Sequence, residues 1–258
     1  MVDIGERLQE IKKMVDRGDY FCINRGRQYG KTTTLSFLKK ALEKDYTVFF
    51  ISFEGADESF KTLDSLVKYF FSLLRKLQGE SLSPKAKKLL NRYTGHAFFK
   101  IRPNEGNAAE LISDFCHANE KPIVVIIDEV DQAGNYESFI KFLGLLRDKY
   151  LNREEMPAFH SVILAGVYDI KNLKLKIRGE EEHQYNSPWN IAAQFNINMD
   201  LTESGIKGML DDYENDHHTG MDTAKIARLL WDYTSGYPFL VSRLCQIIDE
   251  KLNQDWSE

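Results

Sequence analysis

Residues 24–33 read NRGRQYGKTT and lie between a short apolar run and a pattern typical of an amphipathic helix. The triplet Gly30-Lys31-Thr32 matches the end of the phosphate-binding pattern G-x-x-x-x-G-K-[ST], which joins a strand to a helix. The first glycine of that pattern falls at position 25, which is Arg25, and Gly26 follows one place later. A Gly-Lys-Thr triplet can also simply begin a helix, but the apolar run before it and the helix after it favour a phosphate-binding loop.

We expect this loop, a Walker A element, to bind the phosphates of ATP, because backbone N–H groups at a helix N-terminus point at an anion. Lys31 is expected to reach the β- and γ-phosphates, and the Thr32 hydroxyl to ligate Mg²⁺. Arg25 either changes the entry of the loop or adds a cation near the phosphates. The loop residues predicted to bind the nucleotide are Arg27, Gln28, Tyr29, Gly30, Lys31, Thr32 and Thr33.

A second signal, the Walker B element, is the apolar run 123–127 followed by Asp128 and Glu129. Ligands of open parallel sheets bind at the carboxyl ends of the strands, so these carboxylates are expected beside the phosphate loop. We expect Asp128 to hold Mg²⁺ and Glu129 to act as the general base, alongside Lys31 as a catalytic residue. A strand followed by a solvated acidic turn is the alternative. Asp131 is expected to cap a helix or to support the site from behind.

Strands and helices alternate along the chain, which predicts a parallel sheet with helices on both faces. The predicted strands are 20–24, 46–53, 123–127, 161–165 and 195–201. The predicted helices are 6–17, 32–42, 59–77, 107–119, 139–150, 202–213, 223–234 and 239–253. Residues 81–106 are interpreted as a helical insertion and 171–190 as an irregular polar segment. We expect a core domain over 1–201 and a small helical subdomain over 202–258.

The composition is that of an ordinary globular protein, with 43% hydrophobic and 28% charged residues. The net charge of −5 argues against a surface that grips nucleic acid as a whole, although a local basic patch stays possible. Cys22, Cys116 and Cys245 are too far apart for a zinc site and odd in number, so buried thiols are expected. No apolar run approaches the ~20 residues of a membrane span, and no signal-peptide pattern begins the chain, so a cytoplasmic location is expected.

Four stretches together resemble the AAA-like ATPase domains, near the signal-transduction ATPases with numerous domains. They are NRGRQYGKTTTL (24–35), VVIIDEVD (124–131), SVILAGVYDIKNLKLKIRGEEEHQYNSPWNIA (161–192) and DYTSGYPFLVSRLC (232–245). The resemblance implies a P-loop NTPase fold with three α/β/α layers, a sheet of order 5-1-4-3-2 and a C-terminal helical lid. It also implies that the turn Gly236-Tyr237-Pro238 closes over the nucleotide, with Gly236 and Pro238 in contact with it. The residues alone predict only a turn between two helices.

Further roles stay open within the resemblance. A group that senses the γ-phosphate is expected after the fourth strand, where Tyr168 or Asp169 are the candidates. Arg178 and Arg243 are candidate charge-stabilising arginines, with a surface or interdomain salt bridge as the alternative for each. The pair His217-His218 lies in an acidic stretch without further recognisable metal ligands, which favours a solvated loop.

Our leading hypothesis is an AAA-like ATPase that binds ATP with Mg²⁺, hydrolyses it slowly and acts as a nucleotide-dependent switch. One alternative is a DNA-associated ATPase of defence or mobile-element biology, and another is a non-catalytic nucleotide-binding scaffold. A protein partner or a further domain is expected in addition to the nucleotide, and no membrane.

Overall fold

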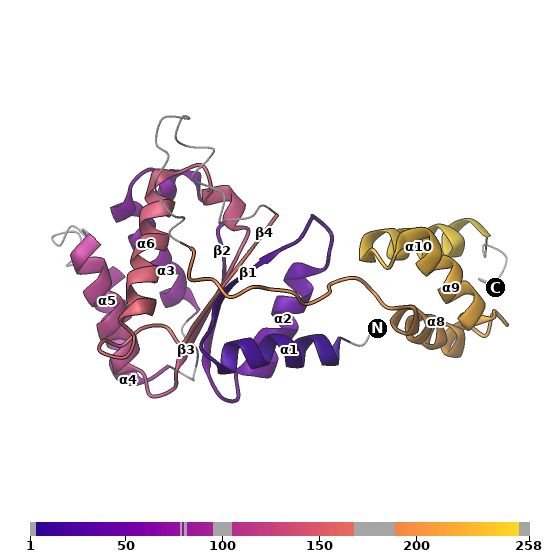
Figure 1. The fold of residues 1–258 in the computed structure, drawn as a ribbon, viewed down its shortest axis with the longest axis horizontal. Helices are drawn as coiled ribbons and strands as arrows, with labels where there is room; N and C mark the ends of the chain where they lie inside the picture. The colour runs from indigo at the N-terminus through magenta and orange to yellow at the C-terminus, as the bar shows by residue number, and fades with distance from the viewer. Residues whose placement is uncertain (1–3, 78, 80–81, 95–104, 168–188, 253–258) are drawn as a thin grey trace.

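The computed structural model describes residues 4–77, 79, 82–94, 105–167 and 189–252. Its centre is a sheet of four parallel strands, β1 (Tyr20–Asn24), β2 (Thr47–Ser52), β3 (Ile123–Asp128) and β4 (Ser161–Gly166), in the order β1-β4-β3-β2 (Figure 1). Every residue of β3 and β4 is buried, as expected for the central strands of a sheet covered on both faces.

Helices cover the two faces of the sheet, with α1 (Gly5–Asp16) and α2 (Lys31–Leu42) on one side (Figure 1). The other side carries α3 (Leu63–Lys76), α4 (Pro84–Thr94), α5 (Glu105–Ala118) and α6 (Glu137–Leu151). Side chains of β1 divide between the two layers: Tyr20 and Cys22 pack into the larger core, and Phe21 and Ile23 into the core beneath α1 and α2. The predicted three-layer α/β/α class is therefore confirmed.

The helix predicted over 59–77 begins later than expected. Residues Asp57–Phe60 form a short 3₁₀-helix, η1, and α3 begins at Leu63. Thr62 accepts a hydrogen bond from the backbone N–H of Ser65, and the Ser65 hydroxyl accepts one from the Thr62 N–H. This reciprocal capping box fixes the start of the helix, because it satisfies backbone donors that the first turn leaves without partners. In the predicted insertion, residues 95–104 lie outside the described part of the chain.

The fifth strand predicted over 195–201 does not form, so the predicted order 5-1-4-3-2 is wrong in that detail and the sheet has the order β1-β4-β3-β2. The segment packs Phe195 and Ile197 against the core beneath α1 and α2, which explains the strand-like alternation in the sequence. A single bridge to β1 lies just before the segment, where the Ala193 N–H donates to the Tyr20 carbonyl (2.8 Å). Further along, arginine side chains, rather than a neighbouring strand, donate hydrogen bonds to the carbonyls of this segment. Arg25 donates to the Ile197 carbonyl, and Arg7 donates to the Asp200 carbonyl. We call residues 197–201 the linker, because they lead into the C-terminal helices.

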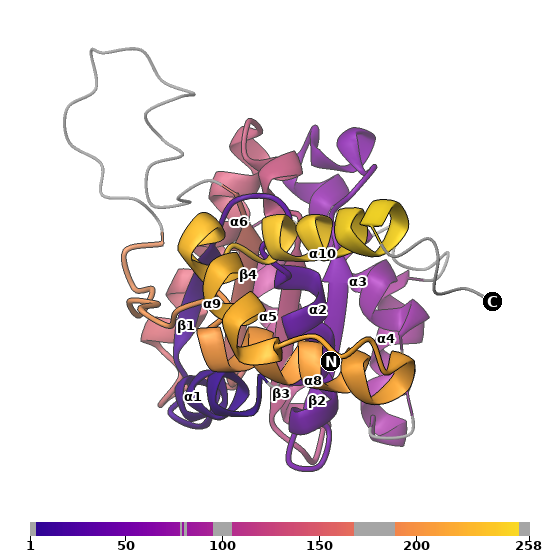
Figure 2. The same cartoon turned by 90° about the vertical axis from the view of Figure 1, so that its right-hand side faces the viewer.

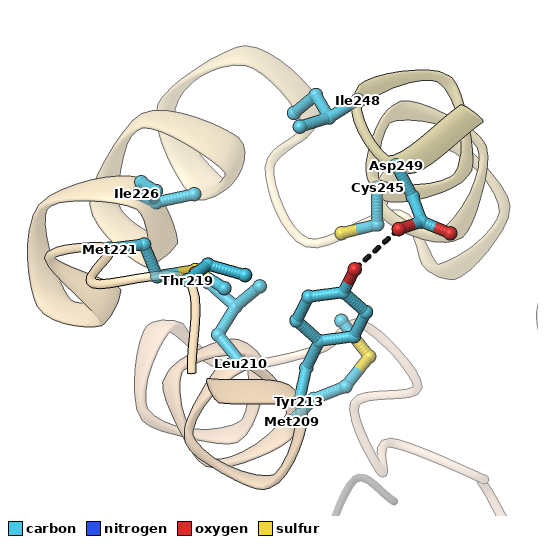
Figure 3. A pocket seen from close by; sticks show the side chains of 9 residues that line it. All are labelled: Met209, Leu210, Tyr213, Thr219, Met221, Ile226, Cys245, Ile248 and Asp249. Carbon is cyan, nitrogen blue, oxygen red and sulfur yellow. Dashed lines mark hydrogen bonds between the residues drawn. The ribbon is translucent and has the colours of Figure 1, made fainter. Parts of the chain in front are cut away.

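The C-terminal helices α8 (Glu203–His217), α9 (Thr223–Thr234) and α10 (Pro238–Leu252) have a hydrophobic cluster of their own and lie in front of the sheet in Figure 2. Thr202 caps α8 by accepting from the Gly205 N–H, so the helix begins at Glu203. A cavity of about 340 Å³ lies between the three helices, with Met209, Met221 and Cys245 among its walls (Figure 3). The Tyr213 hydroxyl donates to Asp249 at its rim.

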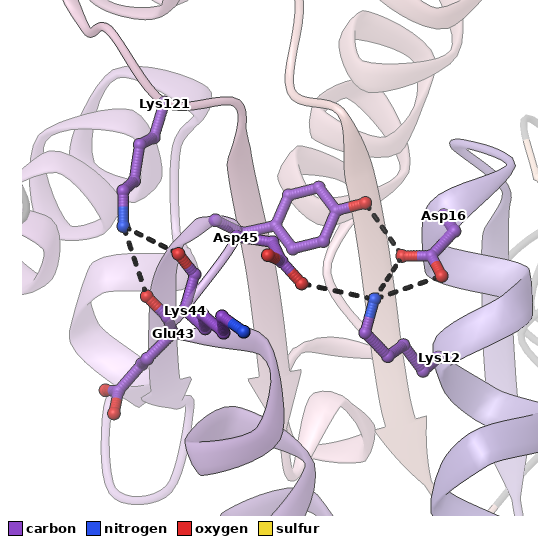
Figure 4. A network of polar contacts seen from close by, with 7 residues as sticks. Lys12, Asp16, Glu43, Lys44, Asp45 and Lys121 are labelled. Atoms are coloured by element: carbon purple, nitrogen blue, oxygen red, sulfur yellow. Dashed lines mark hydrogen bonds and ion pairs between the residues drawn. The ribbon is translucent and has the colours of Figure 1, made fainter.

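A polar network holds α1 to the turn between α2 and β2 (Figure 4). The Asp16 carboxylate accepts from Lys12 Nζ (2.8 Å) and from the Tyr46 hydroxyl (2.8 Å), and Lys12 also pairs with Asp45. Burial and the hydrogen bond to Asp16 raise the pKa of Tyr46 to about 12. Lys121 caps the C-terminal end of α2 by donating to backbone carbonyls there (Figure 4). The network therefore fastens the C-terminal end of α1 to this turn. Near its N-terminal end, α1 carries Arg7, which bonds the linker.

All three cysteines are free thiols; Cys22 is buried as expected, whereas Cys116 and Cys245 are half-buried. Burial raises the pKa of the Cys116 thiol. Within the described ranges, no helix is both long and apolar enough to cross a membrane.

Candidate functional site

The loop between β1 and α2 has a backbone that exposes the start of the helix. Gly30 precedes α2 with a left-handed conformation (φ 70°), and Gln28 is also left-handed (φ 64°). Gly30 has no side chain that could cap α2, and the first N–H groups of a helix have no hydrogen-bond partner within the helix. The backbone N–H groups of the first turn of α2, from Lys31 to Thr33, are therefore suited to bind an anion.

The Lys31 side chain turns back over the loop. Its ammonium donates to the carbonyls of Arg25 (2.8 Å) and Gly26 (2.9 Å), and the residue is only 8% exposed. The contacts hold a buried positive charge against the backbone of the loop.

The predicted metal ligands lie in direct contact. The Thr32 hydroxyl donates to Asp128 Oδ2 at 2.6 Å, although the two residues are 96 positions apart in sequence. Asp128 is the last residue of β3 and only 3% exposed, and its other oxygen accepts from the Glu129 N–H (3.0 Å). A hydroxyl and a carboxylate at one point form an all-oxygen set, which suits Mg²⁺.

Glu129 occupies a strained backbone position immediately after β3, with φ 55° in the left-handed region that non-glycine residues rarely adopt. It begins the short 3₁₀-helix η3 (Val130–Ala133). The described part of the chain has four non-glycine residues with positive φ. Two of them, Gln28 and Glu129, lie at the predicted site, and the other two, His218 and Ser235, are left-handed C-caps of α8 and α9. Such strain persists where the surrounding structure enforces it and is concentrated at functional sites.

Asp131 supports the site by joining the ends of the two central strands. Its carboxylate accepts a hydrogen bond from the Val167 N–H, in the segment that follows β4. A Cβ on Gly166 would come within 2.9 Å of the same carboxylate, so glycine is needed for this approach. Asp131 thereby holds the start of the segment in which a γ-phosphate sensor is expected. The candidates Tyr168 and Asp169 lie outside the described residues, as does Arg178.

Arg25 shapes the entry of the loop through its hydrogen bonds, which is the first of the two roles considered for it. Its guanidinium donates to the Asn24 carbonyl (2.9 Å) and the Ile197 carbonyl (3.0 Å), and it lies over the Phe195 ring at 5.7 Å. The side chain is thus directed at the linker. A cavity of about 450 Å³ lies between α1 and this linker, with Arg7 and Ile197 among its lining residues. One of its lining residues, Ile197, is the residue whose carbonyl accepts from Arg25.

The predicted lid turn reaches the loop through Tyr237, a residue that sequence reasoning treated only as part of a turn. Its hydroxyl donates to the Arg27 carbonyl (2.8 Å), and its ring lies 4.7 Å from that of Tyr29. Gly236 has φ 77° and accepts a hydrogen bond from the Leu201 N–H (2.8 Å). Pro238 is the first residue of α10, a position that suits proline. An aromatic residue inside a Gly-x-Pro turn was the signal available in the sequence.

Other candidates lie away from this edge. Arg243 is exposed on α10 and donates to Gln246 Oε1 (2.7 Å), three residues along the same helix. His217 stacks on Tyr213 with ring centroids 4.2 Å apart, and His218 ends α8. Within the part of the chain that the structure describes, no group of three potential metal-ligating side chains is found.

The family follows from the sequence as a whole, because the model of the AAA-like domain matches residues 5–255. The chain belongs to the AAA-like domain family. No curated protein matches the sequence of this AAA-like domain at a significant level.

Two solved structures resemble the AAA-like domain in fold. One is the Walker-type ATPase PABY2304 of Pyrococcus abyssi, with a TM-score of 0.56 and 16% identity over 93% of this chain and 66% of the other. The other is the ORC2 protein of Aeropyrum pernix in its ADP form, with a TM-score of 0.50 and 13% identity over 97% of this chain and 63% of the other. The AAA-like domain thus spans less than two thirds of each of these proteins. At sequence identities this low, the similarity shows a shared fold and nothing about function.

Proposed function

We propose that this chain binds ATP together with Mg²⁺ where the loop 24–33 meets the turn after β3. The observation that carries the proposal is the 2.6 Å contact between Thr32 Oγ1 and Asp128 Oδ2, the two residues assigned to the metal. We assign the nucleotide contacts of the loop to Arg27, Gln28, Tyr29, Gly30, Lys31, Thr32 and Thr33. Thr32 and Asp128 would hold the Mg²⁺, whose charge would offset negative charge that develops on the phosphates.

The residues around this contact are assigned roles in hydrolysis. Lys31 exchanges the carbonyls of Arg25 and Gly26 for phosphate oxygens, so that its charge is compensated in both states. Glu129, fixed by its left-handed backbone beside Asp128, orients water and accepts its proton. We expect slow hydrolysis, because the one candidate charge-stabilising arginine among the described residues, Arg243, is exposed on α10 and bonds Gln246 of the same helix.

The domain division that fits this function is an ATPase core over 1–201 and a helical lid over 202–258. The hydrophobic cluster of α8, α9 and α10 supports the division, because it is made from residues of those helices and Leu201. We assign Gly236 and Pro238 to contact with the nucleotide, since Tyr237 between them already touches the loop.

The cellular role is that of a switch, in the manner of the signal-transduction ATPases with numerous domains. ATP binding draws the lid onto the core, and a protein partner or further domain reads the resulting arrangement. The overall charge of −5 favours a protein partner over DNA. A DNA-associated ATPase becomes the better account if duplex DNA stimulates hydrolysis and salt abolishes the effect.

The test compares Glu129→Gln and Lys31→Ala with Lys40→Ala, which removes an exposed lysine of the same helix. ATP binding is measured by titration with Mg²⁺, and hydrolysis by phosphate release. We expect Glu129→Gln to bind ATP and lose hydrolysis, and Lys31→Ala to lose binding. Equal hydrolysis by Glu129→Gln and the unaltered chain contradicts the catalytic assignment and supports a nucleotide-binding scaffold.

A further inference from the structure

The lid turn is placed by the linker rather than by α10 alone. Leu201 N–H donates to the Gly236 carbonyl, and a Cβ on Gly236 would come within 2.0 Å of the Leu201 carbonyl oxygen. With φ 77°, position 236 accepts glycine and little else. Tyr237 therefore follows a residue whose position is fixed by contact with the linker.

The linker is in turn fastened to the loop and to α1. The Arg25 guanidinium bonds the Ile197 carbonyl, and that of Arg7 bonds the Asp200 carbonyl (2.9 Å). These bonds form a continuous series of contacts from the loop's entry along the linker to Gly236. Tyr237 provides a second connection between the same two segments, which closes a circuit from loop to linker to lid and back to the loop.

The loop presents two features to Tyr237, one on each side of Gln28. The Arg27 carbonyl accepts from the Tyr237 hydroxyl at 2.8 Å, and the Tyr29 ring lies 4.7 Å from the Tyr237 ring at an interplanar angle of 39°. Gln28 between them is left-handed, with φ 64°. A loop without this turn would direct the Arg27 carbonyl and the Tyr29 ring differently. Tyr237 thus contacts a particular backbone conformation of the loop.

We propose that Tyr29 and Tyr237 form an aromatic latch, in which Tyr237 is a positioning residue for the phosphate loop. The latch stabilises the loop conformation that receives the phosphates and couples it to the position of the lid. This inference rests on the proposed nucleotide-binding function and adds the route by which loop and lid act on one another. Since coupling between two sites is reciprocal, a nucleotide that fixes the loop also tightens the lid.

The expected size follows from the two contacts. A tilted aromatic pair and a neutral hydrogen bond, both at a partly exposed site, together correspond to roughly tenfold in an equilibrium constant. Loss of the latch lowers the fraction of chains whose loop is in the phosphate-binding conformation. The apparent affinity for ATP falls in proportion to that fraction. We expect ATP to bind roughly tenfold more weakly to Tyr237→Ala and roughly threefold more weakly to Tyr237→Phe, which retains the ring pair.

The test is a double-mutant cycle of Tyr29→Ala and Tyr237→Ala on ATP–Mg²⁺ affinity, measured by calorimetry. Tyr233→Ala is the matched control, because it removes a tyrosine of the same lid that is 82% exposed. A lid–core distance, measured between spin labels on α2 and α9 with and without ATP, reports the coupling directly. Thermal unfolding of each variant verifies that it folds, and Tyr237→Phe serves if Tyr237→Ala does not.

The latch predicts that the double mutant is no weaker than Tyr237→Ala alone, because Tyr29→Ala removes only the ring pair that Tyr237→Ala also removes. It also predicts that ATP shortens the lid–core distance less in Tyr237→Ala than in the control. Additive effects, or single mutants that bind ATP as Tyr233→Ala does, overturn the latch. If the unaltered chain binds no ATP, the proposed function itself falls, and that outcome is distinct from failure of the latch alone.

Discussion

Replacement of Thr32 by valine tests the contact on which the site depends. The change keeps a β-branched side chain of nearly the same shape and removes the hydroxyl that donates to Asp128 at 2.6 Å. Asp128 is 3% exposed, so little water can replace the lost donor. It retains a hydrogen bond from the Glu129 N–H. A buried carboxyl that loses one of its partners thus becomes less well satisfied in the folded state.

The expected cost is about 1–2 kcal/mol, at the lower end for hydrogen bonds to a carboxylate because Thr32 itself is exposed. For a chain of this size the melting temperature then falls by roughly 2–8 °C. Thr33→Val is the matched control, since it makes the same change one residue later, where the side chain is also exposed. We expect chemical denaturation to show a lower free energy of unfolding for Thr32→Val than for Thr33→Val.

The same variant has a second readout. If Thr32 ligates Mg²⁺ in the complex, then ATP affinity of Thr32→Val no longer rises when Mg²⁺ is added, whereas Thr32→Ser retains the dependence. The reasoning is refuted if Thr32→Val and Thr33→Val are equally stable and both bind ATP in an Mg²⁺-dependent way.

Three further predictions concern the surroundings of the site. Gly236→Ala should cost roughly 2–4 kcal/mol of unfolding free energy, because the new Cβ meets the Leu201 carbonyl at 2.0 Å and φ is 77°; denaturation equal to that of the unaltered chain contradicts this. Arg25→Ala should cost about 1–2 kcal/mol and increase hydrogen exchange of the linker, and unchanged exchange would show that the linker does not need this anchor. Burial lowers the pKa of His160, which stacks on Tyr46, although a backbone hydrogen bond and a nearby carboxylate oppose the shift. As the pH falls below about 6.5, the unfolded chain takes up a proton at His160 before the folded chain does, so the folded state loses stability. Between pH 7.5 and about 5, the melting temperature of His160→Phe should therefore fall less than that of the unaltered chain. An equal fall in both proteins contradicts the assignment.

The central strands and the meeting of loop 24–33 with the end of β3 could be predicted from sequence. The run 123–127 is apolar without interruption because β3 is buried on both faces, and Asp128 stands where the strand ends. Parallel strands bring their carboxyl ends to one edge, so the topology predicts that Thr32 and Asp128 lie near one another, as their hydrogen bond shows.

The errors and omissions arise where side chains at long range decide the backbone. Residues 195–201 alternate like a strand, but Arg7 and Arg25 bond carbonyls that a strand would pair. Neither contact has a local signature, since the partners are 193 and 172 positions apart. The role of Tyr237 is of the same kind, because its partner Arg27 is 210 positions away. The late start of α3 was readable in principle, as Thr62 and Ser65 have the spacing of a capping box.

The central claim is that loop 24–33 binds ATP through Lys31 with Mg²⁺ held at Thr32 and Asp128. The most direct measurement is calorimetric titration of ATP into the full chain, with and without Mg²⁺, for the unaltered protein, Lys31→Ala and Lys40→Ala. The account predicts Mg²⁺-dependent binding by the unaltered protein and Lys40→Ala, and its loss in a folded Lys31→Ala. Absence of binding by the unaltered protein, or equal binding by Lys31→Ala, contradicts it.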